Sequence, residues 1–262
     1  MLSNRSSATP RVQSLDRAFA LLEAIADAGG SARLTELSAS TGFPLPTIHR
    51  IVRSLVAGGY LRQEPSRRYA LGPRLIHLGD RAAHMLGAWA VPHLNELVAE
   101  IGETANMAML EGDQAVYAAQ VPSAHSMRMF TEVGRRVSAH STGVGKALLS
   151  QLPDKDVLAL LHRTGMDAHT PSTITTVEAM AAELARVRER GYAIDDGEQE
   201  TGVRCVAVPV PEAPTLVAIS VSGPSSRVTI ERMGSILPVL RRVAAELSHE
   251  LRGSTAQGPS PA

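Results

Sequence analysis

The chain has 262 residues, of which 44% are hydrophobic and 20% are charged, and its formal net charge is zero. This composition is ordinary for a globular protein, and the length suits two domains or one large one. No apolar run is long enough for a transmembrane helix, and the N-terminal residues lack the apolar segment of a secretory signal. A single cysteine, Cys205, excludes an intrachain disulfide, and we expect the protein in the cytoplasm.

The charges are distributed unevenly along the chain. Residues 1–81 carry 11 basic and 6 acidic side chains, whereas the remainder carries 15 and 20. All basic residues of the first part are arginines, which can contact phosphate or guanine through two hydrogen bonds at once. A basic front and an acidic remainder indicate a nucleic-acid-binding module joined to a module of another kind.

The first predicted element is a helix that follows a polar tail. Residues 1–11 are expected to be disordered. Ser14 is a candidate N-cap, and Asp16 stands in the first turn, where the helix dipole favours an anion. Apolar residues then repeat at helical spacing until an Ala-Gly-Gly sequence at 28–30 ends the helix.

Residues 34–60 predict a helix, a tight turn at Gly42 and a second helix that begins with prolines. The second helix has one apolar stripe, made of Ile48, Ile51, Val52, Leu55 and Val56. Its opposite face carries groups that contact base edges and phosphates in a major groove, namely Thr47, His49, Arg50, Arg53 and Ser54. The pattern is typical of a helix-turn-helix, although an ordinary corner between two core helices would look similar.

A short basic hairpin follows the second helix. Residues 60–63 and 69–71 are predicted strands, and the loop between them carries Arg67 and Arg68, with Arg62 close by. A basic hairpin in this place is a wing, which can lie along the phosphate backbone or enter the minor groove. The alternative is a hairpin with solvated charges and no ligand.

A long connection and an α+β domain complete the chain. Residues 73–90 are predicted to form one stiff helix with an apolar seam available to a second chain, followed by a helix at 91–101. Beyond Glu103 the pattern predicts strands at 105–109, 115–121, 127–130, 192–195, 205–210 and 216–222. Helices are expected at 144–151, at 154–162, from a capping box at 175–178 to Gly191, and at 229–251. Strands interleaved with helices indicate an α+β sensor-like domain, followed by a disordered tail.

Long stretches in a characteristic order identify a family. The front half contains VQSLDRAFALLEAI, LTELSASTGFPLPTIHRIVRSLVAGGYL and RRYALGPRL, and the back half contains MRMFTEVGRRVSAHSTGVGKALLSQLP, GYAIDDGEQETGVRCVAVPV and AISVSGPSSRVT. With these, residues 12–251 resemble the IclR family of bacterial transcriptional regulators. The resemblance implies an α+β fold of four parts: a winged helix-turn-helix at 12–72, a linker helix at 73–91, a GAF-like effector-binding domain at 92–251 and a tail at 252–262.

The resemblance also implies how such a protein works. It predicts a homodimer or a dimer of dimers that binds a palindromic operator in double-stranded DNA, with repression as the commoner outcome and activation as the alternative. No membrane partner, catalytic residue, metal or cofactor is expected. The predicted DNA contacts are the groups on the second helix and the wing: Thr47, His49, Arg50, Arg53, Arg67 and Arg68.

The resemblance further implies a small-molecule site. In members similar to glyoxylate- and allantoin-pathway repressors, a glycine loop, an aspartate, a cysteine and two serines hold the effector; here these are Gly143, Val144, Asp195, Cys205, Ser220 and Ser222. Independently, the residues after His140 open a helix whose free N–H groups attract an anion, and the two serines share one strand face. A small carboxylate, glyoxylate or another 2-oxo acid, is the expected effector.

Other interpretations fit less well. A Walker A motif would need glycine at His140 and a hydroxyl at Ala147, and a dinucleotide fingerprint would need glycine at Leu148. The histidines show no spacing that pairs metal ligands. An enzyme using Cys205 with His140 is the alternative of another class, but the apolar sequence around Cys205 favours a buried or pocket-lining residue. A third hypothesis is a metabolite sensor that acts through a protein partner.

Overall fold

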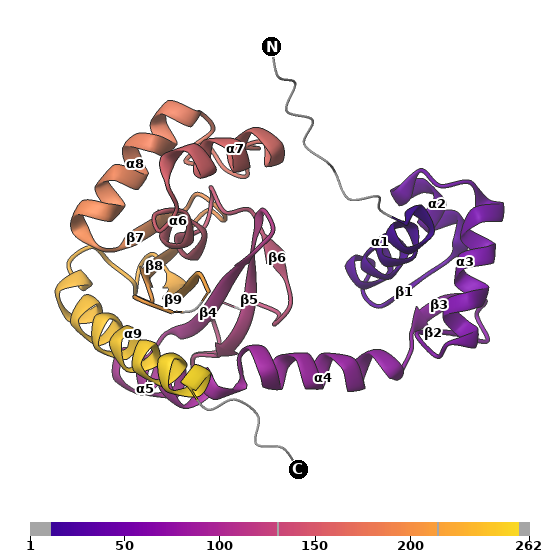
Figure 1. The fold of residues 1–262 in the computed structure, drawn as a ribbon, viewed down its shortest axis with the longest axis horizontal. Helices are drawn as coiled ribbons and strands as arrows, with labels where there is room; N and C mark the ends of the chain where they lie inside the picture. Colours follow the sequence, from indigo (N-terminus) through magenta and orange to yellow (C-terminus); the bar gives the residue numbers. More distant parts are fainter. Residues whose placement is uncertain (1–11, 130, 214, 257–262) are drawn as a thin grey trace. The chain divides into compact units, whose positions relative to one another are not determined.

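The computed structural model describes residues 12–129, 131–213 and 215–256 and contains two compact units, which divide after residue 82. Helix α4 (Arg74–Leu86) runs through the point of division (Figure 1). Within the described ranges, no helix is both long and apolar enough to span a membrane. The predicted tail at residues 1–11 lies outside the described residues.

The N-terminal unit is a helix-turn-helix with a small sheet. Its elements are α1 (Gln13–Asp27), β1 (Ser31–Ala32), α2 (Leu34–Thr41), α3 (Leu45–Ala57), β2 (Leu61–Gln63) and β3 (Tyr69–Leu71). The strands pair antiparallel in the order β1-β3-β2. Gly42 ends α2 in the left-handed conformation, with φ at 69°, which a glycine adopts without steric cost. The three helices share one apolar core, which includes Leu21, Ile25, Leu37, Ile48 and Val52.

The start of α1 differs from the prediction. The helix begins at Gln13, and Val12 rather than Ser14 occupies the N-cap position. The carbonyl of Val12 accepts the N–H groups of Leu15 (2.9 Å) and Asp16 (3.2 Å). Asp16 lies in the first turn, as predicted. The predicted cap was therefore wrong, because Ser14 already lies inside the helix, one residue after its start.

The predicted continuous helix at 73–90 was also wrong. Helix α4 ends at Leu86, and the 3₁₀ turn η1 (Ala88–Ala90) leads into α5 (Val91–Ile101). The residue between α4 and η1 is Gly87, where an added Cβ would lie 2.1 Å from the carbonyl oxygen of Ala118. This close approach to another backbone accounts for a glycine at the point where the helix is interrupted.

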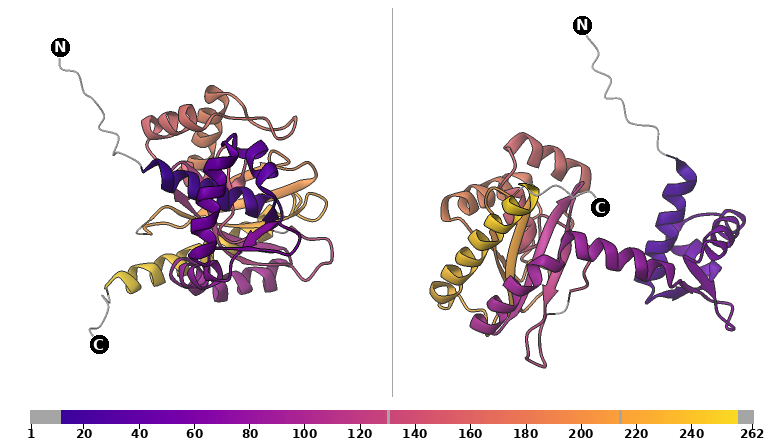
Figure 2. Two further views of the ribbon diagram at one scale, coloured as in Figure 1. Left: turned by 90° about the vertical axis from the view of Figure 1, so that its right-hand side faces the viewer. Right: turned by 60° about the horizontal axis from the view of Figure 1, so that its bottom comes forward.

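The C-terminal unit is built on a six-stranded antiparallel sheet in the order β6-β5-β4-β9-β8-β7. The strands are β4 (Thr104–Glu111), β5 (Gln114–Val121), β6 (Arg136–Val137), β7 (Ala193–Asp196), β8 (Val203–Pro209) and β9 (Val217–Pro224). Helices α5 and α9 (Met233–Ala256) pack side by side on one face (Figures 1 and 2). Helix α6 (Gly143–Leu149) covers the other face, and α7 (Asp154–Thr164) and α8 (Val177–Arg190) pack around it. The predicted fold class is confirmed.

One predicted strand, at 127–130, is not formed by its described residues. The Thr104 hydroxyl donates to the carbonyl of Met129 (3.0 Å), and the Arg227 guanidinium donates to that of Met127 (2.8 Å). Side chains therefore occupy carbonyls that a neighbouring strand would need. Phe130 lies outside the described residues.

Smaller differences concern helix ends and short strands. Thr176, one residue later than predicted, caps α8 by accepting the N–H of Ala179 (3.3 Å). Helix α9 starts at Met233 instead of Thr229 and continues to Ala256, so the first residues of the predicted tail are helical. Residues 257–262 lie outside the described part of the chain. The two-residue strands β1 and β6 were not predicted, because two residues carry no readable period.

Candidate functional site

Helix α3 has one buried and one polar face. Ile48, Ile51 and Val52 face the core, whereas the opposite side is exposed. Pro44 is the N-cap and Pro46 stands in the first turn, where its missing N–H leaves no hydrogen bond unmade. A shallow hollow of about 330 Å³ lies on the exposed side, lined by His49, Arg50, Arg53, Ser54 and Ala57. Thr47 is half-buried at the edge of the same face.

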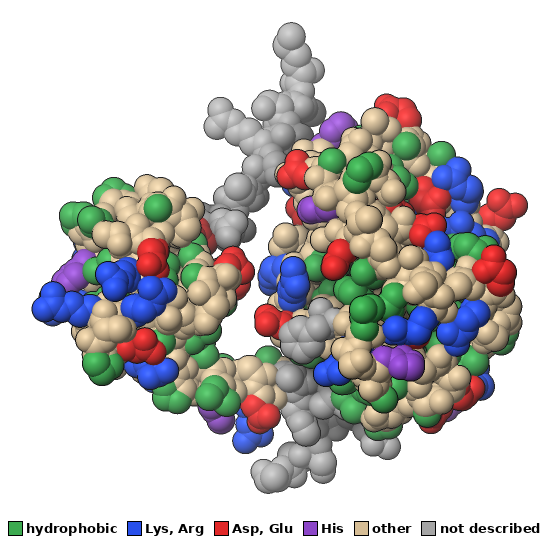
Figure 3. All heavy atoms as spheres, turned by 180° about the vertical axis from the view of Figure 1, so that it is seen from behind, with side chains coloured by type: hydrophobic (Ala, Val, Ile, Leu, Met, Phe, Trp, Pro, Cys, Tyr) green, Lys and Arg blue, Asp and Glu red, His purple; other side chains and the backbone are tan. Residues whose placement is uncertain are grey.

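The two wing arginines have different surroundings. Arg67 is exposed, but the guanidinium of Arg68 donates to both carboxylate oxygens of Glu36 (3.1 and 3.0 Å) and to the carbonyl of Ser31 (2.8 Å). The backbone N–H of Arg33 and the Arg68 side chain together hold the pKa of Glu36 below its usual range. Arg68, which we predicted as a DNA contact, therefore ties the wing to α2. Basic side chains gather beside a histidine on this unit (Figure 3).

The sheet of the C-terminal unit brings the predicted effector residues together. Asp195 pairs with Cys205, and Cys205 pairs with Ser222, so these side chains share one face. Ser220 lies two residues from Ser222 on the same face. All four residues are buried, with exposed fractions from 0 to 6%. The structure thus forms a polar cluster at one end of the face that α6 covers.

Helix α6 completes this cluster through its glycines. A Cβ at Gly143 would lie 2.8 Å from the Cys205 sulfur, so the helix backbone approaches the thiol as only glycine allows. Thr142 caps the helix by accepting the N–H of Gly145 (3.1 Å), and the first intrahelical bond runs from Lys146 N–H to the Thr142 carbonyl (2.9 Å). The N–H groups of Gly143 and Val144 come before that bond and have no acceptor within the helix.

Burial governs the ionisation of the cluster. Burial first, and the nearby Asp195 carboxylate second, raise the pKa of the Cys205 thiol to about 11. Burial likewise raises the pKa of Asp195 to about 6, although its Oδ1 accepts the N–H groups of Glu198 (2.7 Å) and Gln199 (3.3 Å). A neutral thiol is a poor nucleophile. The His140 Nε2 lies 3.1 Å from the carbonyl oxygen of Asp167, so its partner is not the Cys205 thiol. This arrangement argues against an activated cysteine.

Sequence reasoning missed a buried asparagine in the cluster. The Asn106 amide donates to the hydroxyls of Ser220 and Ser222 (both 3.4 Å) and accepts from Gln120 (2.8 Å). Asn106 lies directly opposite Ser220 in the sheet. Its position between apolar residues of a buried strand was a signal, but only the strand register shows what it contacts. Met107, by contrast, packs in the core on the opposite face.

A buried ion pair next to the cluster was also missed. Lys146 is 1% exposed, and its Nζ donates to Glu198, which is 7% exposed. Burial raises the pKa of Glu198, and Lys146 opposes that shift. The same Glu198 donates its backbone N–H to Asp195, so the pair braces the loop beside the predicted effector site.

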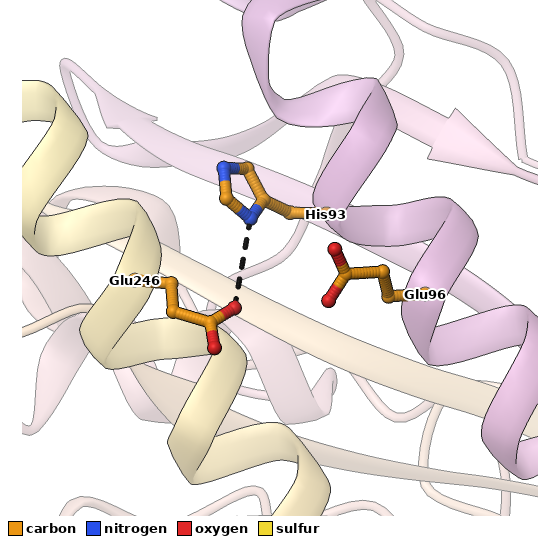
Figure 4. A group of neighbouring side chains, drawn as sticks. All are labelled: His93, Glu96 and Glu246. Atoms are coloured by element: carbon orange, nitrogen blue, oxygen red, sulfur yellow. Dashed lines mark ion pairs between the residues drawn. The ribbon is translucent and has the colours of Figure 1, made fainter.

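Three side chains between α5 and α9 have potential metal-ligand atoms close together: His93, Glu96 and Glu246 (Figure 4). The His93 Nδ1 lies 3.8 Å from Glu246. The guanidinium of Arg242 already lies 3.2 Å from Glu96 and 3.1 Å from Glu246. A cation of the protein thus occupies the place between the carboxylates, and we interpret the group as an ion-pair network that joins the two helices.

Family models match both units of the chain. The model described as the IclR helix-turn-helix domain matches residues 14–65, and the model of the bacterial transcriptional regulator IclR C-terminal matches residues 83–249. The chain belongs to the IclR family of bacterial transcriptional regulators. Membership identifies it as a DNA-binding transcriptional regulator with an effector-binding C-terminal domain, as the resemblance implied.

Similar proteins support the family over almost the whole chain. The chain is 37% identical over 248 residues to the transcriptional repressor IclR of Escherichia coli K12, covering 92% of this chain and 90% of that protein. An IclR transcriptional regulator structure from Alicyclobacillus acidocaldarius matches with 30% identity and a TM-score of 0.80, over 92% and 99% of the two chains. An IclR homologue from Microbacterium hydrocarbonoxydans, complexed with 4-hydroxybenzoate, shares the fold at 24% identity, with a TM-score of 0.76 over 92% and 99%.

Proposed function

We propose that this IclR-family regulator is a repressor of a catabolic operon and that a small carboxylate controls its binding to operator DNA. The main support for the proposed DNA binding is the polar face of α3. Arg50 and Arg53 enter the major groove, where an arginine can donate two hydrogen bonds to one guanine. Thr47 and His49 flank them, and Arg67 extends from the wing.

The effector part of the proposal rests on the buried polar cluster. The N–H groups of Gly143 and Val144 and the hydroxyls of Ser220 and Ser222 are donors that suit a carboxylate. Asp195 and Cys205 face the rest of the ligand. Because every member is buried, the site favours a compact molecule, and glyoxylate or another 2-oxo acid is our first candidate. The complex of the Microbacterium homologue makes 4-hydroxybenzoate the second probe.

Signal transfer follows from dimer geometry. We propose a homodimer, or a dimer of dimers, whose two α3 helices occupy half-sites about 34 Å apart or a multiple of that distance. The effector then acts by favouring one arrangement of the two DNA-binding units, transmitted through α4. A small rotation suffices, because both half-sites must be contacted at once.

A gel shift tests the proposal. The purified protein is mixed with the DNA upstream of its own gene, with and without millimolar glyoxylate or 4-hydroxybenzoate. Release of the DNA by either acid supports a ligand-controlled repressor. Retention with both acids contradicts the effector assignment, and Arg50→Ala binding as tightly as the wild type contradicts the DNA-reading face.

A further inference from the structure

A second hollow on the N-terminal unit shares only His49 with the hollow on the reading face of α3. It has a volume of about 380 Å³ and lies where the start of α2, one residue of α3 and the wing meet. Its polar lining consists of arginine, histidine, hydroxyl and amide side chains: Arg33, Thr35, His49, Gln63, Ser66, Arg67 and Tyr69. These groups donate hydrogen bonds or carry positive charge, and no carboxylate lines the hollow among the described residues.

The nearest acids are turned toward other partners. Glu36, one residue after Thr35, lines a different hollow and has both oxygens engaged by Arg68. Glu64, on the wing, lies 3.5 Å from Arg62 and accepts a weak hydrogen bond from Ser66 (3.4 Å). The lining of the hollow therefore keeps its positive charge, and the side chains of Arg33 and Arg67 are both exposed.

The backbone of Arg67 supports a role in binding. Its φ is 61°, in the left-handed region, and its N–H donates to the carbonyl of Glu64 (2.9 Å) to close the wing turn. Glycine is the ordinary residue at such a position, because a side chain there is strained. An arginine at a position where glycine would fold better indicates that the side chain serves something other than the fold.

We propose that this hollow holds one backbone phosphate of the bound duplex, between Arg33 and Arg67, with the hydroxyl of Thr35 as a further donor. The wing then lies along the phosphate backbone instead of entering the minor groove. The inference rests on the proposed function, since it adds a contact with the DNA backbone to the contact that α3 makes with the bases. His49 lines both hollows and joins the base-reading and phosphate-binding surfaces.

The test measures affinity for short duplexes as a function of salt concentration. The variants are Arg33→Ala, Arg67→Gly and Thr35→Asp, and the control is Arg81→Ala, an exposed arginine of α4 that lines neither hollow. Losing one phosphate contact should make the negative slope of the logarithm of the association constant against the logarithm of salt concentration shallower by about 0.9. At 0.1 M salt this change is roughly an eightfold loss of affinity. Because phosphates carry no sequence information, a selected operator and a mixed-sequence duplex should lose affinity equally.

Two of the variants separate binding from folding. Arg67→Gly removes the strained side chain, and Thr35→Asp places an anion in the first turn of α2, where the helix dipole favours it. Both should melt at the wild-type temperature or above it while binding DNA more weakly. Wild-type slopes for Arg33→Ala and Arg67→Gly would overturn the proposal, as would a loss confined to A·T-rich duplexes, which indicates minor-groove insertion. A wild-type protein that binds no duplex would instead refute the proposed function itself.

Discussion

Lys146 offers a sharp test of how the C-terminal unit is held together. Its Nζ donates to Glu198, and both side chains are more than nine-tenths buried. Within the described structure, the other oxygen of Glu198 has no hydrogen-bond partner, so Lys146 is the main compensation for a buried carboxylate. Removing one member of a buried ion pair costs about 3–5 kcal/mol, whereas replacing both by apolar groups is often neutral. Lys146→Met should therefore lower the free energy of unfolding by about 3–5 kcal/mol.

Urea and thermal melts of the full chain, followed by circular dichroism, measure this effect. For a unit of this size each kcal/mol shifts the melting temperature by about 2–4 °C, so we expect a decrease of roughly 6–20 °C. The chain's second lysine, Lys155, is exposed on α7 and provides the control, since Lys155→Met should change little. The double variant Lys146→Met with Glu198→Leu should recover most of the loss. A single variant within 1 kcal/mol of the wild type, or a double variant as unstable as the single one, would refute the reasoning.

Three further predictions concern burial and close contacts. Folding raises the pKa of Asp195 from 3.8 to about 6. The protonated carboxyl therefore contributes fully to stability below about pH 4, and this contribution is lost as the pH rises through 6. In urea melts, Asp195→Asn should flatten the dependence of the free energy of unfolding on pH. Gly87→Ala should destabilise the fold by about 1–3 kcal/mol, because the added Cβ would meet the Ala118 carbonyl. Gly79→Ala in α4, where the added Cβ meets nothing, should stabilise the fold by roughly 0.5–1 kcal/mol in the same melts. A thiol-reactive dye at pH 8 should label Cys205 only after unfolding; rapid labelling of the native protein would contradict its burial and raised pKa.

Local patterns explain why the helix-turn-helix was predictable. The apolar stripe of α3, the left-handed Gly42 and the prolines at the start of α3 each act within a few residues, so their effect is readable along the chain. The break at Gly87 is different. Its surroundings favour a helix, and the need for a glycine comes from the carbonyl of Ala118, which only the folded structure brings close.

The same distinction applies to the candidate sites. The serine pair was readable from strand spacing, but the partner of Asn106 depends on the register between β4 and β9. Arg67 and Arg68 are neighbours in sequence, yet only Arg68 meets Glu36 from α2. Lys146 follows the glycine loop directly in the sequence, and only the fold shows that it pairs with Glu198. Side chains on adjacent residues thus acquire different roles through contacts that the linear pattern does not contain.

The two proposed anion sites also differ in how they bind charge. On the N-terminal unit, exposed arginines attract phosphates across solvent, an interaction that salt screens over about 8 Å at physiological ionic strength. In the effector site that we propose, buried N–H and hydroxyl groups around a neutral thiol would bind an acid through hydrogen bonds, which salt weakens far less. Rising salt would therefore remove operator DNA without removing the effector. An effector can release DNA at constant salt only by binding one arrangement of the two DNA-binding units more tightly than the other.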